Sequence, residues 1–182
     1  MYIKANKRID KQDGSRGKVI FMMVKKLDEI LKNREFAYVA TVSSKGEPNA
    51  APKFLLKKEN DFLYLIDHVM GMTYKNLKIR PCASVAVVDP NTLMGYQING
   101  SVEIIEKGME HKRLLKEVRD KEIKLTAKRI IEDVRGTTHH EAFEVAFPEH
   151  LVVFKVRIER ITEIRTSGKL KREKLYHLLE EK

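Results

Sequence analysis

"FAYVATVSSKGEPNAAPKFLL", residues 36–56, decides the fold because it contains two extended segments joined by a short turn. Its first part is rich in β-branched and aromatic residues, which favour strands. The glycine and proline of "SKGEP" indicate the turn. The second part continues to residue 58 and carries Pro52, which has no amide N–H to donate. We therefore expect a second strand with Pro52 at a sheet edge or a bulge.

The segments around this unit extend the β pattern and add a few helices. Further strands are expected over residues 61–67, 82–89, 95–106 and 143–164. Helical periodicity appears over residues 24–33, 108–134 and 169–182. Short strands, tight turns and few helices predict a mainly β (α+β) fold, a small closed barrel with peripheral helices.

This pattern also suggests how the chain is divided. Residues 1–22 are polar, lack a sustained period and form a basic N-terminal extension. Residues 23–165 form the barrel domain, with a helical insertion at about 108–134. Residues 166–182 are expected to end the chain as an amphipathic helix.

Composition limits the classes of protein to consider. The chain has 182 residues, of which 42% are hydrophobic, so it can bury one substantial core. Its one cysteine, Cys82, cannot form an internal disulfide, which favours a reducing cytoplasm. The apolar run at residues 19–24 is too short to span a membrane and lacks a signal-peptide cleavage pattern. We expect a cytoplasmic protein without a membrane partner.

The formal net charge of +10 raises the question of nucleic-acid binding. Much of this charge lies in "KANKRIDKQDGSRGK" (residues 4–18) and "SGKLKREK" (residues 167–174), whereas the middle of the chain is mixed. No cluster of aromatic residues suggests a base-stacking surface. The pattern favours solvated basic tails over a nucleic-acid interface.

The stretch "GMTYKNLKIRP", residues 71–81, has the features of an anion site. Thr73 supplies a hydroxyl, Lys75 a positive charge, and the short helix that follows supplies its dipole and free amides. The alternative is that Thr73 is only a helix N-cap and Lys75 only a solvated lysine. Residues alone leave both interpretations open.

Taken together, residues 36–56, 61–88 and 95–105 resemble the FMN-binding split-barrel family related to pyridoxamine 5'-phosphate oxidase. The resemblance covers about residues 24–106, and residues 151–164 show a weaker similarity to the closing strand of the family. It rests on the order and spacing of several motifs. It implies a split β-barrel of FMN-binding type, a homodimer with FMN at the interface, and a small-molecule redox partner.

The resemblance also implies a set of cofactor-binding residues. Pro52, Lys53 and Phe54 would run beside the isoalloxazine ring and ribityl chain, with Lys57 near the flavin. Two residues at the end of the third strand would lie under the cofactor, namely Asp67 and His68.

The phosphate would be held by Thr73 and Lys75, which match the phosphate loop of the family. Met72 stands where many relatives carry lysine, so one phosphate charge is missing. On the fifth strand, Gln97 would reach the flavin of the partner subunit. The candidate surface for the dimer contact is an apolar stripe made up of Val85, Val87, Ile98 and Val102. The alternative is that these four side chains pack in the core.

The functional prediction is an FMN-binding protein, a flavin-dependent oxidoreductase of unknown substrate. It differs from the oxidase itself, because the chain has no tryptophan and lacks that enzyme's C-terminal segment. The alternatives are a deazaflavin (F420)-dependent reductase and a non-enzymatic basic binding module. No catalytic residue is assigned, since a flavin would carry the chemistry. Adjacent His139 and His140 would point apart in a strand, so no metal site is expected.

Overall fold

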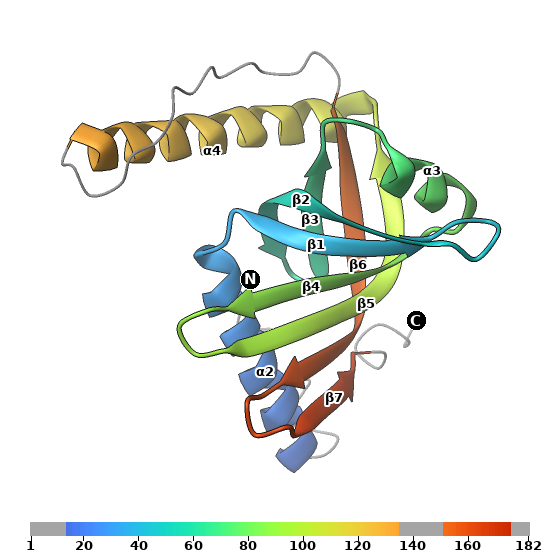
Figure 1. Cartoon of the computed structure of the whole chain (residues 1–182), viewed down its shortest axis with the longest axis vertical. Helices are drawn as coiled ribbons and strands as arrows, with labels where there is room; N and C mark the ends of the chain where they lie inside the picture. Colours follow the sequence, from blue (N-terminus) through green and yellow to red (C-terminus); the bar gives the residue numbers. More distant parts are fainter. Residues whose placement is uncertain (1–13, 135–150, 176–182) are drawn as a thin grey trace.

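The computed structural model describes residues 14–134 and 151–175, which form an antiparallel barrel with three helices (Figure 1). The strand order is β3-β2-β1-β4-β5-β6-β7, and β3 also pairs with β6, which closes the first six strands into a barrel. The strands are β1 (Phe36–Val42), β2 (Pro48–Glu59), β3 (Phe62–Asp67), β4 (Cys82–Asp89), β5 (Met94–Ile105), β6 (Val152–Ile164) and β7 (Leu170–Lys174). The helices are α2 (Gly14–Lys32), α3 (Met72–Ile79) and α4 (Gly108–Val134). The expected split-barrel α+β fold is confirmed.

Alternation along the strands places one set of apolar side chains inside the barrel. The stripe considered as a dimer contact belongs to this interior, so core packing is the correct alternative for it. Its members are all buried: Val85, Val87, Ile98 and Val102. Close approach of the neighbouring strand β6, at a bulge in its pairing with β5, explains Gly100, because a Cβ there would lie 1.7 Å from the carbonyl oxygen of Arg157.

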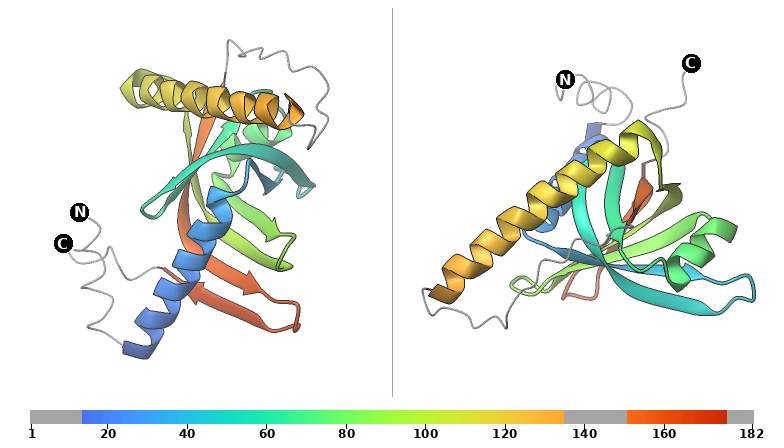
Figure 2. Two further views of the ribbon diagram at one scale, coloured as in Figure 1. Left: turned by 90° about the vertical axis from the view of Figure 1, so that its left-hand side faces the viewer. Right: turned by 90° about the horizontal axis from the view of Figure 1, so that it is seen from above.

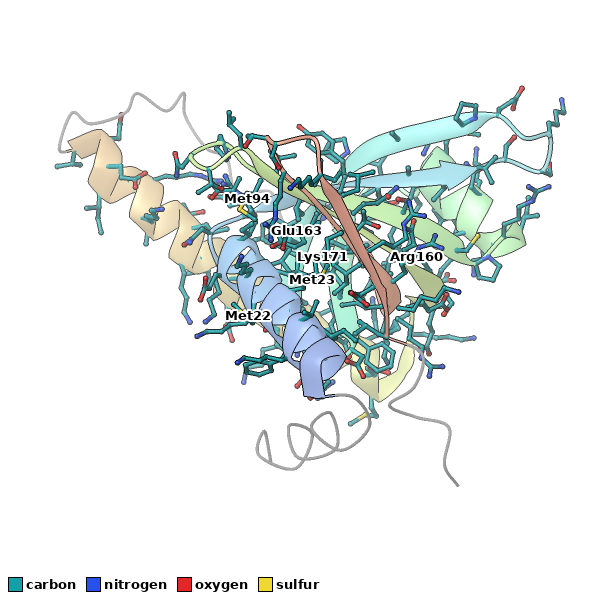
Figure 3. All side chains as sticks on the ribbon, turned by 90° about the horizontal axis from the view of Figure 1, so that it is seen from below. Met22, Met23, Met94, Arg160, Glu163 and Lys171 are labelled. Carbon is teal, nitrogen blue, oxygen red and sulfur yellow. The ribbon has the colours of Figure 1, made fainter. Side chains whose placement is uncertain are left out.

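Helix α2 closes one side of this interior. Met23, Leu27 and Leu31, spaced at helical intervals, are buried in the barrel core. Figure 3 looks onto α2 and labels Met23 and the buried Glu163 near it. Glu163 accepts a hydrogen bond from the Tyr96 hydroxyl at 3.0 Å. Burial opposes its ionisation, but hydrogen bonds from Arg165 and Tyr96 outweigh burial and lower the pKa of Glu163.

Helix α4 lies on the outside of the barrel, over β2, β3 and β6 (Figure 2). Leu114 and Val118 are buried there in a second apolar cluster, against outward-facing residues such as Phe54 and Ile66. Its C-terminal end extends past the edge of the barrel (Figure 1). Its bounds agree with the helix expected at about 108–134.

Two boundaries expected from the sequence are wrong. The extension assigned to residues 1–22 is helical from Gly14, and Val19 packs against the core, so α2 begins well before residue 23. The C-terminal helix assigned to residues 166–182 is a strand over Leu170–Lys174, because hydrogen bonds to β6 override its helical period. Residues 135–150 and 176–182 lie outside the described residues, and with them His139, His140 and the start of the strand expected at 143.

Pro52 lies where β2 is locally an edge of the sheet, as the sequence predicts. Pro52 pairs with Tyr38 of β1, but pairing with β3 starts only at Phe54. A bulge follows between Leu55 and Lys57. The first half of β2 therefore has no strand neighbour on the β3 side, which leaves room for a cavity. None of the described helices has the length and apolar character needed to cross a membrane.

Candidate functional site

A cavity of about 340 Å³ lies where the free half of β2 meets the end of β3 and the C-terminal half of α4. We call it the aromatic cavity, after the two phenylalanines in its wall. It brings together five of the residues expected to bind the cofactor: Pro52, Lys53, Phe54, Asp67 and His68. The remaining lining residues are Glu35, Phe36, Ile66, Val69, Glu122, Leu125, Thr126 and Arg129.

A buried ion pair forms the polar part of this cavity. Lys53 Nζ lies 2.8 Å from Asp67 Oδ1, and the carboxylate is 1% exposed. The backbone N–H of Val69 also donates to Oδ1, at 3.2 Å. Asp67 Oδ2 is buried and has no hydrogen-bond partner among the described residues. Since an unsatisfied buried acceptor is costly, this oxygen is suited to a donor group of a ligand.

Beside it, His68 and Glu122 form a titratable pair between β3 and α4. Their atoms Nε2 and Oε1 are 3.9 Å apart, and Nδ1 of His68 is buried with no partner among the described residues. Burial raises the pKa of Glu122, while the nearby His68 acts in the opposite direction. A carboxyl group with a raised pKa next to an imidazole can hold a proton at the cavity wall.

Apart from Glu35, Thr126 and Arg129, the rest of the cavity is apolar and aromatic. The rings of Phe36 and Phe54 meet edge to face, with centroids 5.9 Å apart and planes at 79°. Leu125 of α4 lines the cavity as well. Arg129 of α4 forms an ion pair with Glu35, next to the start of β1, and so joins the helix to the barrel across this site. An apolar wall with a few convergent polar groups suits a flat organic ligand.

The expected phosphate residues lie on α3, outside the lining of this cavity. Thr73 is 2% exposed, and its hydroxyl accepts a hydrogen bond from Asn49 Nδ2 at 3.1 Å. Asn49 and Asn76 both donate to Thr41 Oγ1, so this network ties α3 to the first two strands. The N-cap of α3 is Gly71, without a side-chain cap, so the alternative of Thr73 as N-cap is wrong. Lys75 is exposed.

Two further expected residues point elsewhere. Lys57 Nζ lies 2.7 Å from Glu117 and 3.1 Å from Glu59, in a different cavity. Gln97 donates from Nε2 to Ser84 Oγ at 3.0 Å, on the outer face of the sheet. Neither lines the aromatic cavity, so a role for them in cofactor binding stays a prediction.

Sequence reasoning missed the residues that α4 contributes. Glu122, Leu125, Thr126 and Arg129 recur at helical spacing and share one face, which was the available signal. Nothing in their types showed which strands this face would meet. In the two described stretches, no group of three histidine, cysteine or acidic side chains is placed to hold a metal ion.

Comparison with known proteins agrees with the fold. The family profile described as pyridoxamine 5'-phosphate oxidase matches residues 23–164. Comparison with curated protein sequences gives no significant match.

Several solved structures share the fold at low sequence identity. HupZ from Group A Streptococcus is 22% identical, with a TM-score of 0.58 over 78% of this chain and 94% of that chain. A protein of Clostridium acetobutylicum related to general stress protein 26 is 17% identical, with a TM-score of 0.58 over 86% and 97%. An FMN-binding protein of Nostoc punctiforme, related to pyridoxamine 5'-phosphate oxidase, is 12% identical, with a TM-score of 0.51 over 84% and 94%.

The buried ion pair between Lys53 and Asp67 leads to a prediction about the stability of the fold. Replacing Lys53 with methionine leaves the Asp67 carboxylate buried without its cation, which should lower the free energy of unfolding by about 3–5 kcal/mol. The double variant Lys53→Met/Asp67→Leu removes both charges and should recover most of that loss. Urea denaturation of the three proteins measures both effects. A double variant as unstable as the single one would show that the pair is not the cause.

Proposed function

The chain belongs to the pyridoxamine 5'-phosphate oxidase family, and from this we propose that it binds FMN and acts as a flavin-dependent oxidoreductase on a small-molecule substrate. The observation that carries the proposal is the aromatic cavity. Five residues expected to contact the flavin meet there, and two buried polar atoms, Asp67 Oδ2 and His68 Nδ1, have no partner among the described residues.

The side chains that line the cavity suit a flavin ring in polarity and in hydrogen-bonding groups. Isoalloxazine is planar and largely apolar, and it carries an N–H and carbonyl groups on one edge. Phe36 and Phe54 supply an aromatic wall, and Asp67 Oδ2 would accept a hydrogen bond from the ring N–H or from a ribityl hydroxyl. Lys53 keeps the carboxylate in place and partly balances its charge.

For the phosphate we propose the start of α3. The first amides of a helix have no intrahelical acceptor and favour an anion. Lys75 is exposed within the first turn and adds a positive charge. Since the Thr73 hydroxyl is buried in its network with Asn49, backbone amides are better placed to bind a phosphate than this side chain.

A bound FMN would supply the electron or hydride transfer. The chain's own residues would bind the ring, exclude water from it and hold a proton beside it. His68 and Glu122 are suited to the last role, because their pair lies in the cavity wall and the raised pKa of Glu122 favours its protonated form. They are positioned to exchange a proton with a substrate in the same cavity.

We further propose that the protein is a homodimer in which the second copy covers the mouth of this site. Large apolar side chains are exposed on the outer face of the sheet, next to the cavity. Phe36 is 54% exposed, Tyr38 62% and Val88 55%. Two more exposed apolar residues, Ile164 and Leu170, pair with each other where β6 meets β7. An apolar face this broad is typical of an interface between copies.

The FMN proposal is tested by titrating the purified protein with FMN, riboflavin and a deazaflavin. Lys75→Ala should weaken FMN by about 10- to 100-fold, because a charge-assisted hydrogen bond contributes about 1.5–3 kcal/mol. It should leave riboflavin, which has no phosphate, unchanged. Lys45→Ala, at an exposed lysine in the turn between β1 and β2, is the matched control and should alter neither affinity.

One outcome would overturn the phosphate site at α3, and another would overturn FMN itself. If Lys75→Ala lowers the affinity for FMN and for riboflavin equally, the phosphate is not bound at the start of α3. Binding of deazaflavin without FMN, or of no flavin at all, would reject FMN as the cofactor.

The dimer proposal is tested by sedimentation equilibrium at micromolar concentration. Tyr38→Asp places a charge in the exposed apolar face and should shift the protein from dimer to monomer. The dimer dissociation constant should rise at least about 100-fold. Ile79→Asp introduces the same charge at a residue that is 61% exposed on α3, and it should remain dimeric. A wild-type protein that sediments as a monomer in the presence of FMN would refute the dimer.

A further inference from the structure

A second cavity, of about 490 Å³, lies on the other side of the bulge in β2, between α2, β2 and α4. We call it the lysine cavity because half of its lining residues are lysines. These are Lys25 and Lys32 of α2, Lys57 and Lys58 of β2, and Lys121 of α4. The other lining residues are Asp28, Glu29, Leu31, Leu55 and Leu56.

Carboxylates neutralise only part of this positive charge. Lys58 pairs with Asp28 at 3.0 Å, and Lys57 pairs with Glu117 and Glu59. Within the part of the chain that the structure describes, Lys25 and Lys32 have no ion pair. They lie on α2 at positions seven residues apart, two turns along one side of the helix.

Lys121 is the most informative of the five. Its Nζ donates to the carbonyl oxygens of Leu55 at 2.5 Å and Leu56 at 3.0 Å. An ammonium has three donors, so one remains for another acceptor. No carboxylate pairs with Lys121 in the described residues, and burial lowers its pKa. An anion in the cavity would supply both the missing acceptor and the missing counter-charge.

We propose that the lysine cavity binds a small multivalent phosphate anion. Lys25, Lys32 and Lys121 line the cavity from two helices, so they are available to different phosphate oxygens of one multivalent anion. Five lysines against two acidic residues leave an excess of positive charge in the lining, which attracts an anion. The volume is in the range of pockets for small organic ligands, so the anion can be an inorganic diphosphate or the phosphate end of a nucleotide-sized molecule.

This inference is independent of the flavin proposal, since the two cavities share no lining residue. They are neighbours nonetheless, because Glu122 follows Lys121 on α4, and Phe54 precedes Leu55 on β2. A phosphorylated ligand in the lysine cavity would therefore lie beside the proposed flavin site.

The test is isothermal titration of the full chain with inorganic diphosphate and with ADP, each in the absence and in the presence of excess FMN. Lys25→Gln/Lys32→Gln should weaken both ligands by at least about 10-fold, since it removes two charge-assisted contacts. Lys18→Gln, at an exposed lysine of the same helix outside the cavity, is the matched control and should leave both unchanged. Tighter binding of ADP than of diphosphate would support a phosphorylated organic ligand, and equal binding would support the free anion.

Three results would overturn the inference. The first is no binding of either anion at millimolar concentration. The second is equal weakening by Lys18→Gln, which would show a general response to net charge. The third is loss of diphosphate binding as FMN is added, which would assign the cavity to the flavin.

Discussion

The contact between Lys121 and the bulge in β2 determines how the functional face of this protein is built. At the bulge, the carbonyl oxygens of Leu55 and Leu56 both accept hydrogen bonds from one ammonium group of α4. The same ammonium lies 5.2 Å from the centre of the Phe54 ring. Bulges interrupt the hydrogen-bond ladder of a strand, and here the interruption provides the attachment point of a helix. With Leu114 and Val118, this contact fixes α4 against the barrel.

The attachment creates two cavities of different chemistry on either side of one strand. On one side, α4 covers an aromatic wall, a buried carboxylate with a free oxygen, and a histidine paired with a carboxyl of raised pKa. On the other side, it contributes Lys121 to a cavity in which half of the lining residues are lysines. The first suits a planar ring with a hydrogen-bond donor, and the second suits phosphate. If both proposed ligands bind, a redox cofactor and a phosphorylated small molecule would lie close together, as the proposed oxidoreductase requires.

The barrel could be predicted from the sequence because strand alternation, turn residues and the order of motifs are local signals. The grouping of Pro52 to Phe54 with Asp67 and His68 was also within reach, since neighbouring strands of one motif carry them. The contribution of α4 was not, because Glu122 and Arg129 reach the site only through packing that no local pattern specifies. The prediction of a helix over Leu170–Lys174 failed for a related reason. This segment pairs with β6 as a strand, although its sequence has a helical period. Burial of Thr73 likewise depends on Asn49, which is distant in sequence.

If the aromatic cavity beneath α4 is the ligand site, a large side chain that fills it should block FMN binding. Thr126 lines the cavity, whereas its neighbour Ala127 is exposed and does not. The measurement is the FMN affinity of Thr126→Trp and Ala127→Trp, with circular dichroism to confirm that both are folded. Thr126→Trp should weaken FMN by at least about 100-fold, roughly 2.7 kcal/mol, and Ala127→Trp should bind FMN like wild type. A folded Thr126→Trp protein with unchanged FMN affinity would rule out this cavity as the flavin site.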